Sequence, residues 1–279
     1  MSAPKHPHDP RDVLRRHQLH PKRSFSQNFL IQRQIVEALA RVIAESGESV
    51  VELGPGVGTL THALLNEGCD VVAVDLDPDM VRVLESELGE HPGITIVRGD
   101  AAETDFAELA ERVGQKVVVA GNLPYQSTGA IIRQVVAHRE SITSAVLMVQ
   151  REVRDRLIAS PSTRQYGALT VFSQAAFEIE TIMRLKPGCF YPAPKVESAV
   201  VRLTPHPSPR ALETAAFREV VRAAFQQRRK TLRNALSGLR NPDVIENALR
   251  DAEIDGSRRG ETLSVEEFAA LAKRFPTTS

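Results

Sequence analysis

The chain has 279 residues and a formal net charge of zero, with 42% hydrophobic and 25% charged residues and two cysteines. This composition is typical of a globular protein that can bury a core without disulfides, and it excludes a disordered or collagen-like chain. No apolar run approaches the ~18 residues of a membrane span and no secretory signal is evident, so we expect a cytoplasmic protein with free thiols, no metal site and no membrane partner.

The predicted elements begin after an N-terminal arm. Residues 1–20 are rich in Pro and His and lack apolar periodicity, so we expect them to be flexible. Apolar residues then recur at helical spacing from about 32 to 46. Further on, Val-rich runs alternate with helical patterns, which predicts βαβ units and a mostly parallel sheet covered on both faces. The expected strands are 49–53, 70–75, 94–97, 116–120 and 145–150, and the expected helices are 59–66, 79–90, 105–113, 128–138 and 151–159.

The pattern changes in the C-terminal third. Two apolar runs, 177–185 and 198–203, can pair as an antiparallel hairpin that closes the sheet. The Pro-rich stretch 204–209 is typical of a linker. Only helical patterns follow, and Ser264 and Glu267 have the spacing of a capping box. We predict an α/β domain over 21–206 and a small all-helical domain over 207–279. The helices expected there are 215–227, 230–239, 244–252 and 265–275.

Polar or glycine-rich clusters follow the first three of these strands, at the sheet edge where ligands bind in open α/β folds. The loop 54–58 has glycines in a G-x-G-x-G spacing, which differs from dinucleotide-binding loops and suits a ligand without a pyrophosphate to cradle. Asp75 lies 21 positions after Gly54, where a carboxylate can accept hydrogen bonds from ribose hydroxyls, whereas Asp77 suits a helix N-cap. Asp100 can accept from an adenine amine or cap a helix.

The fourth strand ends in Asn122-Leu123-Pro124-Tyr125. This pattern brings together an amide oxygen, a main-chain carbonyl and an aromatic ring, and Pro124 stiffens the turn. Two acceptors can hold both hydrogens of an exocyclic amino group while the ring stacks on its base. The motif therefore favours methyl transfer to an adenine N6, in which catalysis is mainly positioning. Taken alone, it also fits a β-turn with a buried Tyr.

With the segments 52–56 and 100–101, this motif resembles those of the S-adenosylmethionine-dependent rRNA adenine N6-dimethyltransferases. The resemblance spans about 22 to 240 and is strongest to the bacterial small-subunit branch, which dimethylates two adjacent adenosines near the 3′ end of 16S rRNA. It implies a Rossmann-like methyltransferase sheet. The further segments that carry it are 26–30, 150–153, 166–171, 190–201 and 229–234.

The resemblance also implies roles for individual residues around S-adenosylmethionine and the target base. Tyr125 and Phe190 would stack on the two faces of a flipped adenine. This sequence has Ser26 where the family usually has Gly, and Asp75 where it often has Glu, so the shorter acid must reach further. The implied catalytic residues are Asn122, Leu123, Pro124, Tyr125 and Phe190. The implied cofactor residues are Asn28 and Leu30 as a cover, Gly54 and Gly56 at the methionine part, Asp75 at the ribose, Asp100 and Ala101 at the adenine, and Asn122 between cofactor and target amine.

The zero net charge hides a segregation along the chain. Residues 37–115 carry 4 basic and 17 acidic groups, whereas residues 116–240 carry 19 and 8. Segregation fits either a docking face or solvated surface, and the resemblance favours phosphate contacts. If one helix carried Arg222, Arg229 and Arg233, they would share a face. The implied partner is 16S rRNA in a small-subunit (30S) precursor, bound by a monomer. The candidate RNA contacts are Lys22, Arg23, Arg222, Arg229, Lys230 and Arg233.

Three alternatives stay open. The 23S rRNA adenine N6-methyltransferases that confer macrolide resistance share the catalytic motifs, but the segments 194–201 and 229–234 favour the small-subunit branch. A non-catalytic RNA-binding assembly factor would keep the fold without the transfer, and the intact strand-end motifs argue against it. A nicotinamide-dependent dehydrogenase is disfavoured by the glycine spacing.

Overall fold

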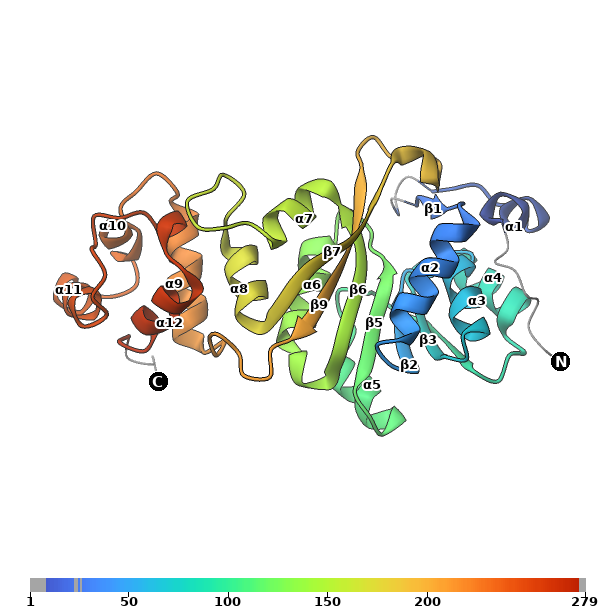
Figure 1. Ribbon diagram of the computed structural model, residues 1–279, viewed down its shortest axis with the longest axis horizontal. Coiled ribbons are helices and arrows are strands. Elements are labelled where there is room, and N and C mark those ends of the chain that lie inside the picture. Colours follow the sequence, from blue (N-terminus) through green and yellow to red (C-terminus); the bar gives the residue numbers. More distant parts are fainter. Residues whose placement is uncertain (1–8, 23–24, 26, 276–279) are drawn as a thin grey trace. The chain divides into compact units, whose positions relative to one another are not determined.

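The computed structural model of the chain describes residues 9–22, 25 and 27–275 (Figure 1). These residues form two compact units. The first lies within Met1–Arg154 and Glu180–Pro205, and the second within Asp155–Ile179 and His206–Ser279. The second unit therefore takes in a segment, 155–179, that the predicted division at residue 206 groups with the sheet. Within this unit the Tyr166 hydroxyl donates to the Leu263 carbonyl at 2.8 Å, which ties that segment to the C-terminal helices.

A seven-stranded sheet runs in the order β4-β3-β2-β5-β6-β9-β7. The strands from β4 to β6 pair in parallel, β9 is antiparallel to β6, and β7 pairs with β9 at the edge. This confirms the predicted α/β class and mostly parallel sheet. The strands are β2 (Ser49–Leu53), β3 (Asp70–Asp75), β4 (Ile94–Arg98), β5 (Val117–Asn122), β6 (Ile142–Gln150), β7 (Phe177–Leu185) and β9 (Ser198–Pro205).

The strand order indicates where a binding site lies. The chain passes from β2 to β3 and β4 on one side, then returns to β5 and β6 on the other side of β2. A crevice opens at such a switch point, outside the carboxyl ends of the strands, because the neighbouring connections leave in opposite directions. All residues of β2 are buried, in keeping with a parallel strand covered on both faces.

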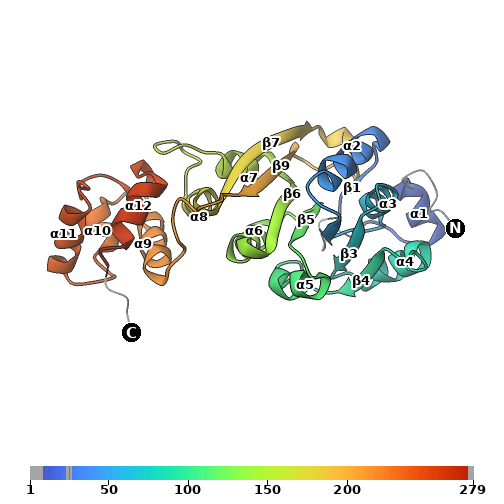
Figure 2. The same cartoon turned by 60° about the horizontal axis from the view of Figure 1, so that its bottom comes forward.

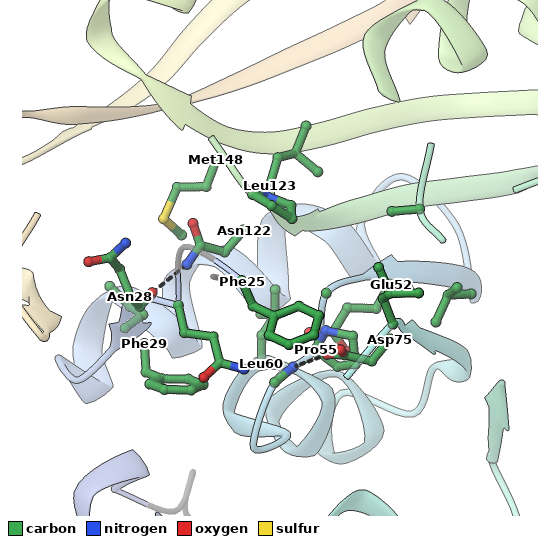
Figure 3. Close-up of a pocket in the computed structure, with 18 of the residues that line it drawn as sticks. Phe25, Asn28, Phe29, Glu52, Pro55, Leu60, Asp75, Asn122, Leu123 and Met148 are labelled. Carbon is green, nitrogen blue, oxygen red and sulfur yellow. Dashed lines mark hydrogen bonds between the residues drawn. The ribbon is translucent and has the colours of Figure 1, made fainter. Parts of the chain in front are cut away.

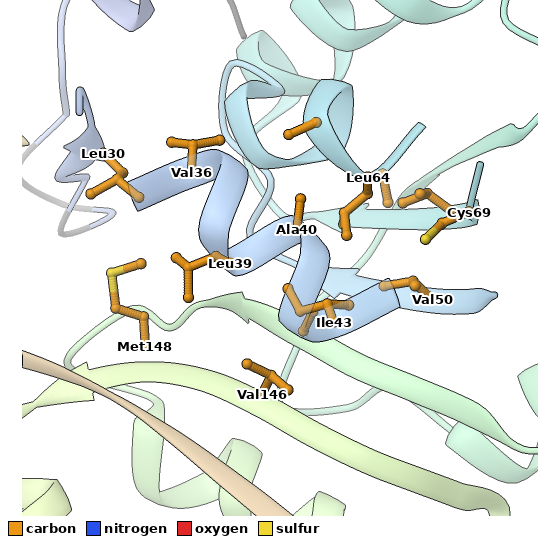
Figure 4. Close-up of a cluster of buried hydrophobic side chains, with 14 of the residues drawn as sticks. Leu30, Val36, Leu39, Ala40, Ile43, Val50, Leu64, Cys69, Val146 and Met148 are labelled. Carbon is orange, nitrogen blue, oxygen red and sulfur yellow. The ribbon is translucent and has the colours of Figure 1, made fainter. Parts of the chain in front are cut away.

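Helices cover both faces of the sheet, as Figure 2 shows: α2, α3 and α4 lie on one side, α5 and α6 on the other. The amphipathic α2 buries Val36, Leu39, Ala40 and Ile43 in the main core, where strand residues such as Val146 join them (Figure 4). The predicted helices of this unit are confirmed, and their ends lie within two residues of the predicted positions. These helices are α2 (Arg33–Ala44), α3 (Thr59–Asn66), α4 (Pro78–Leu88), α5 (Phe106–Val113) and α6 (Thr128–Ala137).

The expectation of a flexible arm over 1–20 is wrong for residues 9–20, whereas residues 1–8 lie outside the described part. Pro10–Arg16 form a helix, α1, because the Asp9 side chain caps it and Pro10 suits its first position. Val13 and Leu14 are buried with Phe29, Val57, Met80 and Val83. Two adjacent apolar residues make no periodic pattern, so the sequence carried no helical signal here.

Two short strands were also not predicted. In the first unit β1 (Phe29–Leu30) pairs with β8 (Phe190–Tyr191) as a separate antiparallel ribbon. This pairing brings the N-terminal segment beside a part of the chain about 160 residues away. A strand of two residues is too short to give a sequence pattern that predicts this pairing.

The second unit is built from helices. The predicted capping box is confirmed, because the Ser264 N–H donates to Glu267 Oε2 at 2.7 Å and the Glu267 N–H to Ser264 Oγ at 3.2 Å. Helix α8 was not predicted. No helix in the described part of the chain combines the length and apolar character needed to cross a membrane. The remaining helices are α7 (Arg151–Leu157, at the junction of the units), α8 (Ala168–Ala176), α9 (Ala215–Gln226), α10 (Leu232–Leu236), α11 (Pro242–Asp251) and α12 (Val265–Ala272).

Helix α1 provides a test of the packing at the N-terminus. Leu14 is 2% exposed in a cluster with Phe29 and Met80, so Leu14→Ala should lower the free energy of unfolding by about 2–4 kcal/mol. Leu212→Ala, at a side chain that is 70% exposed, should change it little. Urea denaturation followed by circular dichroism measures both. Equal effects of the two substitutions would contradict a packed α1.

Candidate active site

A cavity of about 370 Å³ lies at the carboxyl ends of the parallel strands, in the range of small-molecule sites (Figure 3). All eight predicted cofactor residues line it: Asn28, Leu30, Gly54, Gly56, Asp75, Asp100, Ala101 and Asn122. Leu123, Pro124 and Tyr125 line it as well. The structure therefore brings the motifs of four strand ends and the N-terminal segment into one cavity.

The glycine loop after β2 adopts a backbone that favours glycine. Gly54 and Gly56 have φ of 66° and 59°, in the left-handed region. A Cβ on Gly56 would also lie 2.7 Å from the Phe29 ring. The loop therefore keeps its main chain open to the cavity while the aromatic ring packs closely against it.

Asp75 holds this loop from the end of β3. Its Oδ2 accepts from the Gly56 N–H at 3.0 Å, and its Oδ1 accepts from the Asp77 N–H at 2.9 Å. Asp75 is 9% exposed, and burial raises the pKa of its carboxyl despite these hydrogen bonds. Each carboxylate oxygen offers more than one lone pair, so the predicted ribose contact is compatible with this structural role.

Asp77 begins α4, as the sequence predicts. Its side chain accepts from the Asp79 N–H at 3.0 Å, and Pro78 takes the first helical position. Asp100 is held in a similar way, since its Oδ1 accepts from the Ala102 N–H at 2.8 Å. Among the described residues its second oxygen has no hydrogen-bond partner, so it can serve the predicted amine contact in the cavity that Asp100 lines.

The side chain of Asn122, at the end of β5, has a defined direction. Its Nδ2 donates to the Asn28 carbonyl at 2.7 Å, the dashed line beside Met148 in Figure 3. Because a carbonyl only accepts, the amide nitrogen must face Asn28, and Oδ1 is left to accept another hydrogen bond. The turn that follows is fixed by the Leu123 N–H, which donates to the Met148 carbonyl at 3.0 Å.

The two predicted stacking residues, Tyr125 and Phe190, differ in their position relative to the cavity. Tyr125 is half-buried in the cavity lining, and burial raises the pKa of its hydroxyl, which lies 3.4 Å from Ser198 Oγ. Phe190 is 3% exposed, pairs with Leu30 through the β1–β8 ribbon, and packs in the main core rather than in the cavity lining. The predicted stacking of Phe190 on a flipped base stays a prediction, and it would require the ring to become accessible from this buried position.

Glu52 lies in the motif segment 52–56 but was not predicted as a site residue. It lines the cavity, is almost fully buried, and accepts a hydrogen bond from Thr61 Oγ1 at 2.6 Å. Burial raises its pKa to about 7, and the neighbouring Asp75 charge adds to the shift. A carboxyl inside the Val-rich run 49–53 was the signal that could have found it. Phe25, Leu76 and Met148 also line the cavity, but apolar residues carry no distinguishing pattern.

The candidate RNA contacts do not form one set. Lys22 binds Asp77 and Asp79, with Nζ–O distances of 2.7 and 2.5 Å, and Arg23 lies outside the described residues. The expected shared helix face is wrong, because α9 ends at Gln226 and α10 begins at Leu232.

The other cations of this group lie in the second unit. Arg233 pairs with Glu246. Arg222, Arg229 and Lys230 are exposed, and within the described residues their side chains make no hydrogen bond or ion pair. Nor do the described His, Cys, Asp and Glu side chains form any group of three or more suited to a metal ion.

Comparisons with known proteins show the family of this chain. The model of the family described as ribosomal RNA adenine dimethylase matches residues 18–276. A "Ribosomal RNA small subunit methyltransferase A" of Myxococcus xanthus is 45% identical over 97% of this chain and 98% of its own length. A protein of the same name from Clostridium acetobutylicum is 36% identical over 94% and 96%.

Solved structures agree on the fold. The 23S rRNA methyltransferase ErmE is 27% identical, covers 88% of this chain and 99% of its own, and has a TM-score of 0.64. A dimethyladenosine transferase from Plasmodium falciparum has a TM-score of 0.70 at 24% identity, over 87% and 95% of the two chains. The second likeness concerns the fold alone.

Glu52 makes stability depend on pH in a specific direction. With a pKa raised to about 7 in the fold from 4.5, the carboxyl contributes stability that is fully present below pH 4.5 and lost as the pH rises through 7. Glu52→Gln keeps an acceptor for Thr61 and removes the ionisation. The stability of the unsubstituted chain should therefore fall relative to the variant by on the order of 3 kcal/mol between pH 4.5 and 8.

Denaturant titrations at several pH values measure this difference. Glu48→Gln, at an exposed residue just before β2, is the matched control and should leave the pH dependence unchanged. Parallel stability curves for the unsubstituted chain and Glu52→Gln would contradict the prediction.

Proposed function

This chain belongs to the ribosomal RNA adenine dimethylase family, and we propose that it transfers methyl groups from S-adenosylmethionine to N6 of two adjacent adenosines near the 3′ end of 16S rRNA. The observation that carries this proposal is the cavity in which the glycine loop, two strand-end acids and Asn122 meet. Each adenine would receive two methyl groups, giving N6,N6-dimethyladenosine. The substrate would be 16S rRNA in a small-subunit (30S) precursor, and the chain would act as a monomer in the cytoplasm.

The cavity fits the cofactor in volume and in chemistry. When bound, S-adenosylmethionine supplies a methyl group on a positively charged sulfur, and the C–S bond breaks as the new N–C bond forms. Gly54 and Gly56 leave room for its methionine part because neither carries a side chain. Asp75 and Asp100 would accept from the ribose hydroxyls and the adenine amine, and Asn28 and Leu30 would cover it from the N-terminal segment.

Asn122 would act on the target amine by position rather than as a base. Its Oδ1 can accept one N6 hydrogen and the Leu123 carbonyl the other, which turns the nitrogen lone pair toward the incoming methyl group. Pro124 stiffens the turn, and the Tyr125 ring would stack on the flipped base. The proton released from N6 after transfer would pass to water, so no strong general base is required.

Sequence identity favours the small subunit over the 23S alternative. The relatives named small subunit methyltransferase A are 36–45% identical over at least 94% of both chains, whereas ErmE is 27% identical. Arg222, Arg229 and Lys230 are exposed and, within the described residues, are not engaged by carboxylates, so they would serve phosphate contacts with either RNA.

The test is a methyl-transfer assay on defined particles. Purified protein and labelled S-adenosylmethionine are added to 30S and 50S particles from a strain that lacks the modification, and primer extension locates the modified bases. We expect label at two adjacent adenosines of 16S rRNA. Label in 23S rRNA would favour the macrolide-resistance alternative, and binding without transfer would favour an assembly factor.

Asn122→Ala tests the chemistry within the same assay. Loss of the positioned acceptor should lower the transfer rate about 100-fold or more, because this amide would act directly on the reacting nitrogen. The melting temperature should change little, since Asn122 is only partly buried. A large loss of thermal stability, or unchanged transfer, would contradict the assigned role.

A further inference from the structure

The buried carboxylate of Asp77 does more than cap a helix. It is 0% exposed, and besides the Asp79 N–H it accepts Lys22 Nζ on Oδ1 at 2.7 Å and Gln27 Nε2 on Oδ2 at 2.9 Å. An N-cap needs only the bond from the Asp79 N–H. The other two join α4 to a chain segment 50 or more residues earlier.

Lys22 and Gln27 reinforce each other in this contact. The Lys22 N–H donates to Gln27 Oε1 at 2.8 Å, so the Gln27 amide bridges the Lys22 main chain and the Asp77 carboxylate. Lys22 Nζ also lies 2.5 Å from Asp79 Oδ2, and these carboxylates raise the pKa of Lys22. We call the contact of Asp77 with Lys22 and Gln27 the anchor. Removing one member of a buried charged contact leaves the other charge uncompensated, so single substitutions in the anchor should have large effects.

The anchored segment leads directly to the catalytic amide. Asn28 follows Gln27, and its carbonyl accepts the Asn122 Nδ2 hydrogen at 2.7 Å. On its other side Asn28 is followed by β1, which pairs with β8, and the Ile31 N–H donates to the Cys189 carbonyl at 2.9 Å. The carbonyl that orients Asn122 is therefore held from both sides, by Asp77 before it and by β8 after it.

We propose that Asp77 is a positioning residue for methyl transfer: it anchors Lys22 and Gln27 so that the Asn28 carbonyl turns the Asn122 amide, with its Oδ1 toward the target amine. The inference rests on the proposed function for the role of Asn122, but the anchor itself is a property of the fold. Lys22 is on this view part of the active-site framework and not a phosphate contact.

Asp77→Asn separates the anchor from the cap. Asn is as good an N-cap as Asp, so α4 should persist, while the charged contact with Lys22 is lost. Asp105→Asn is the matched control, because Asp105 caps α5 in the same way, from the Ala107 and Glu108 N–H groups, and its other neighbour is His138 rather than a described residue of the N-terminal segment. Lys22→Met breaks the anchor from the other side, and Lys22→Arg should recover most of what Lys22→Met loses.

Two measurements are made on each variant. The first is the rate at which the Asn122 side-chain NH₂ hydrogens exchange with water, followed by ¹⁵N NMR. The signal is assigned by its absence in Asn122→Ala. Slow exchange of these hydrogens reports the bond to the Asn28 carbonyl. The second is kcat and KM for methyl transfer. We expect Asp77→Asn and Lys22→Met to speed that exchange and to lower kcat by about 10-fold to 100-fold, because a displacement of about 1 Å at a reacting group has effects of this size.

The outcomes separate this inference from the proposed function. If the Asn122 signal and kcat in Asp77→Asn match those of Asp105→Asn, Asp77 is only a cap and the inference is overturned. If the unsubstituted chain methylates no 16S rRNA, the proposed function fails. In that case the NH₂ exchange still decides whether Asp77 orients Asn122.

Discussion

Two main-chain N–H groups, from Gly56 and from Asp77, converge on the Asp75 carboxylate, and the rest of the site depends on this contact. Parallel pairing of Leu53 with Val74 brings the ends of β2 and β3 together, but pairing alone does not set the path of the loops beyond them. The carboxylate does so by accepting from both loops at once. Burial raises the pKa of the Asp75 carboxyl, which means that desolvation disfavours its charged form. The same buried position allows the carboxylate to order both loops.

The parts of the structure that were predictable from the sequence are those with a local cause. The runs 49–53 and 70–75 are strands because they are continuous and Val-rich, and the strand order then places Asp75 and Asn122 at one edge. Contacts between distant segments were not predictable. Nothing near Val13 and Leu14 indicates that they pack on Met80, and nothing near Phe190 indicates its burial beside Leu30. The roles of the site residues toward ligands stay predictions.

The charge segregation acquires a different meaning in the fold. Two cations of the N-terminal segment are neutralised by carboxylates of the acidic region 37–115: Arg16 binds Glu87, and Lys22 binds Asp77 and Asp79. These contacts attach the N-terminal segment to α4 within one unit. The cations left exposed in the second unit are a smaller set than composition suggested, and the formal charge of a segment is a poor guide to the field it presents.

The bond between Asn122 and Asn28 limits which chemical group can occupy position 122. One side of that planar group must give a hydrogen to a carbonyl, and the other must receive one from the base. A carboxamide does both, whereas an ionised carboxylate of the same shape would set an oxygen against the Asn28 oxygen at 2.7 Å and repel it. Hydrolysis of this single side-chain amide, a change of one atom with almost no change in volume, would leave the fold intact and reverse the polarity of the contact that aims the site.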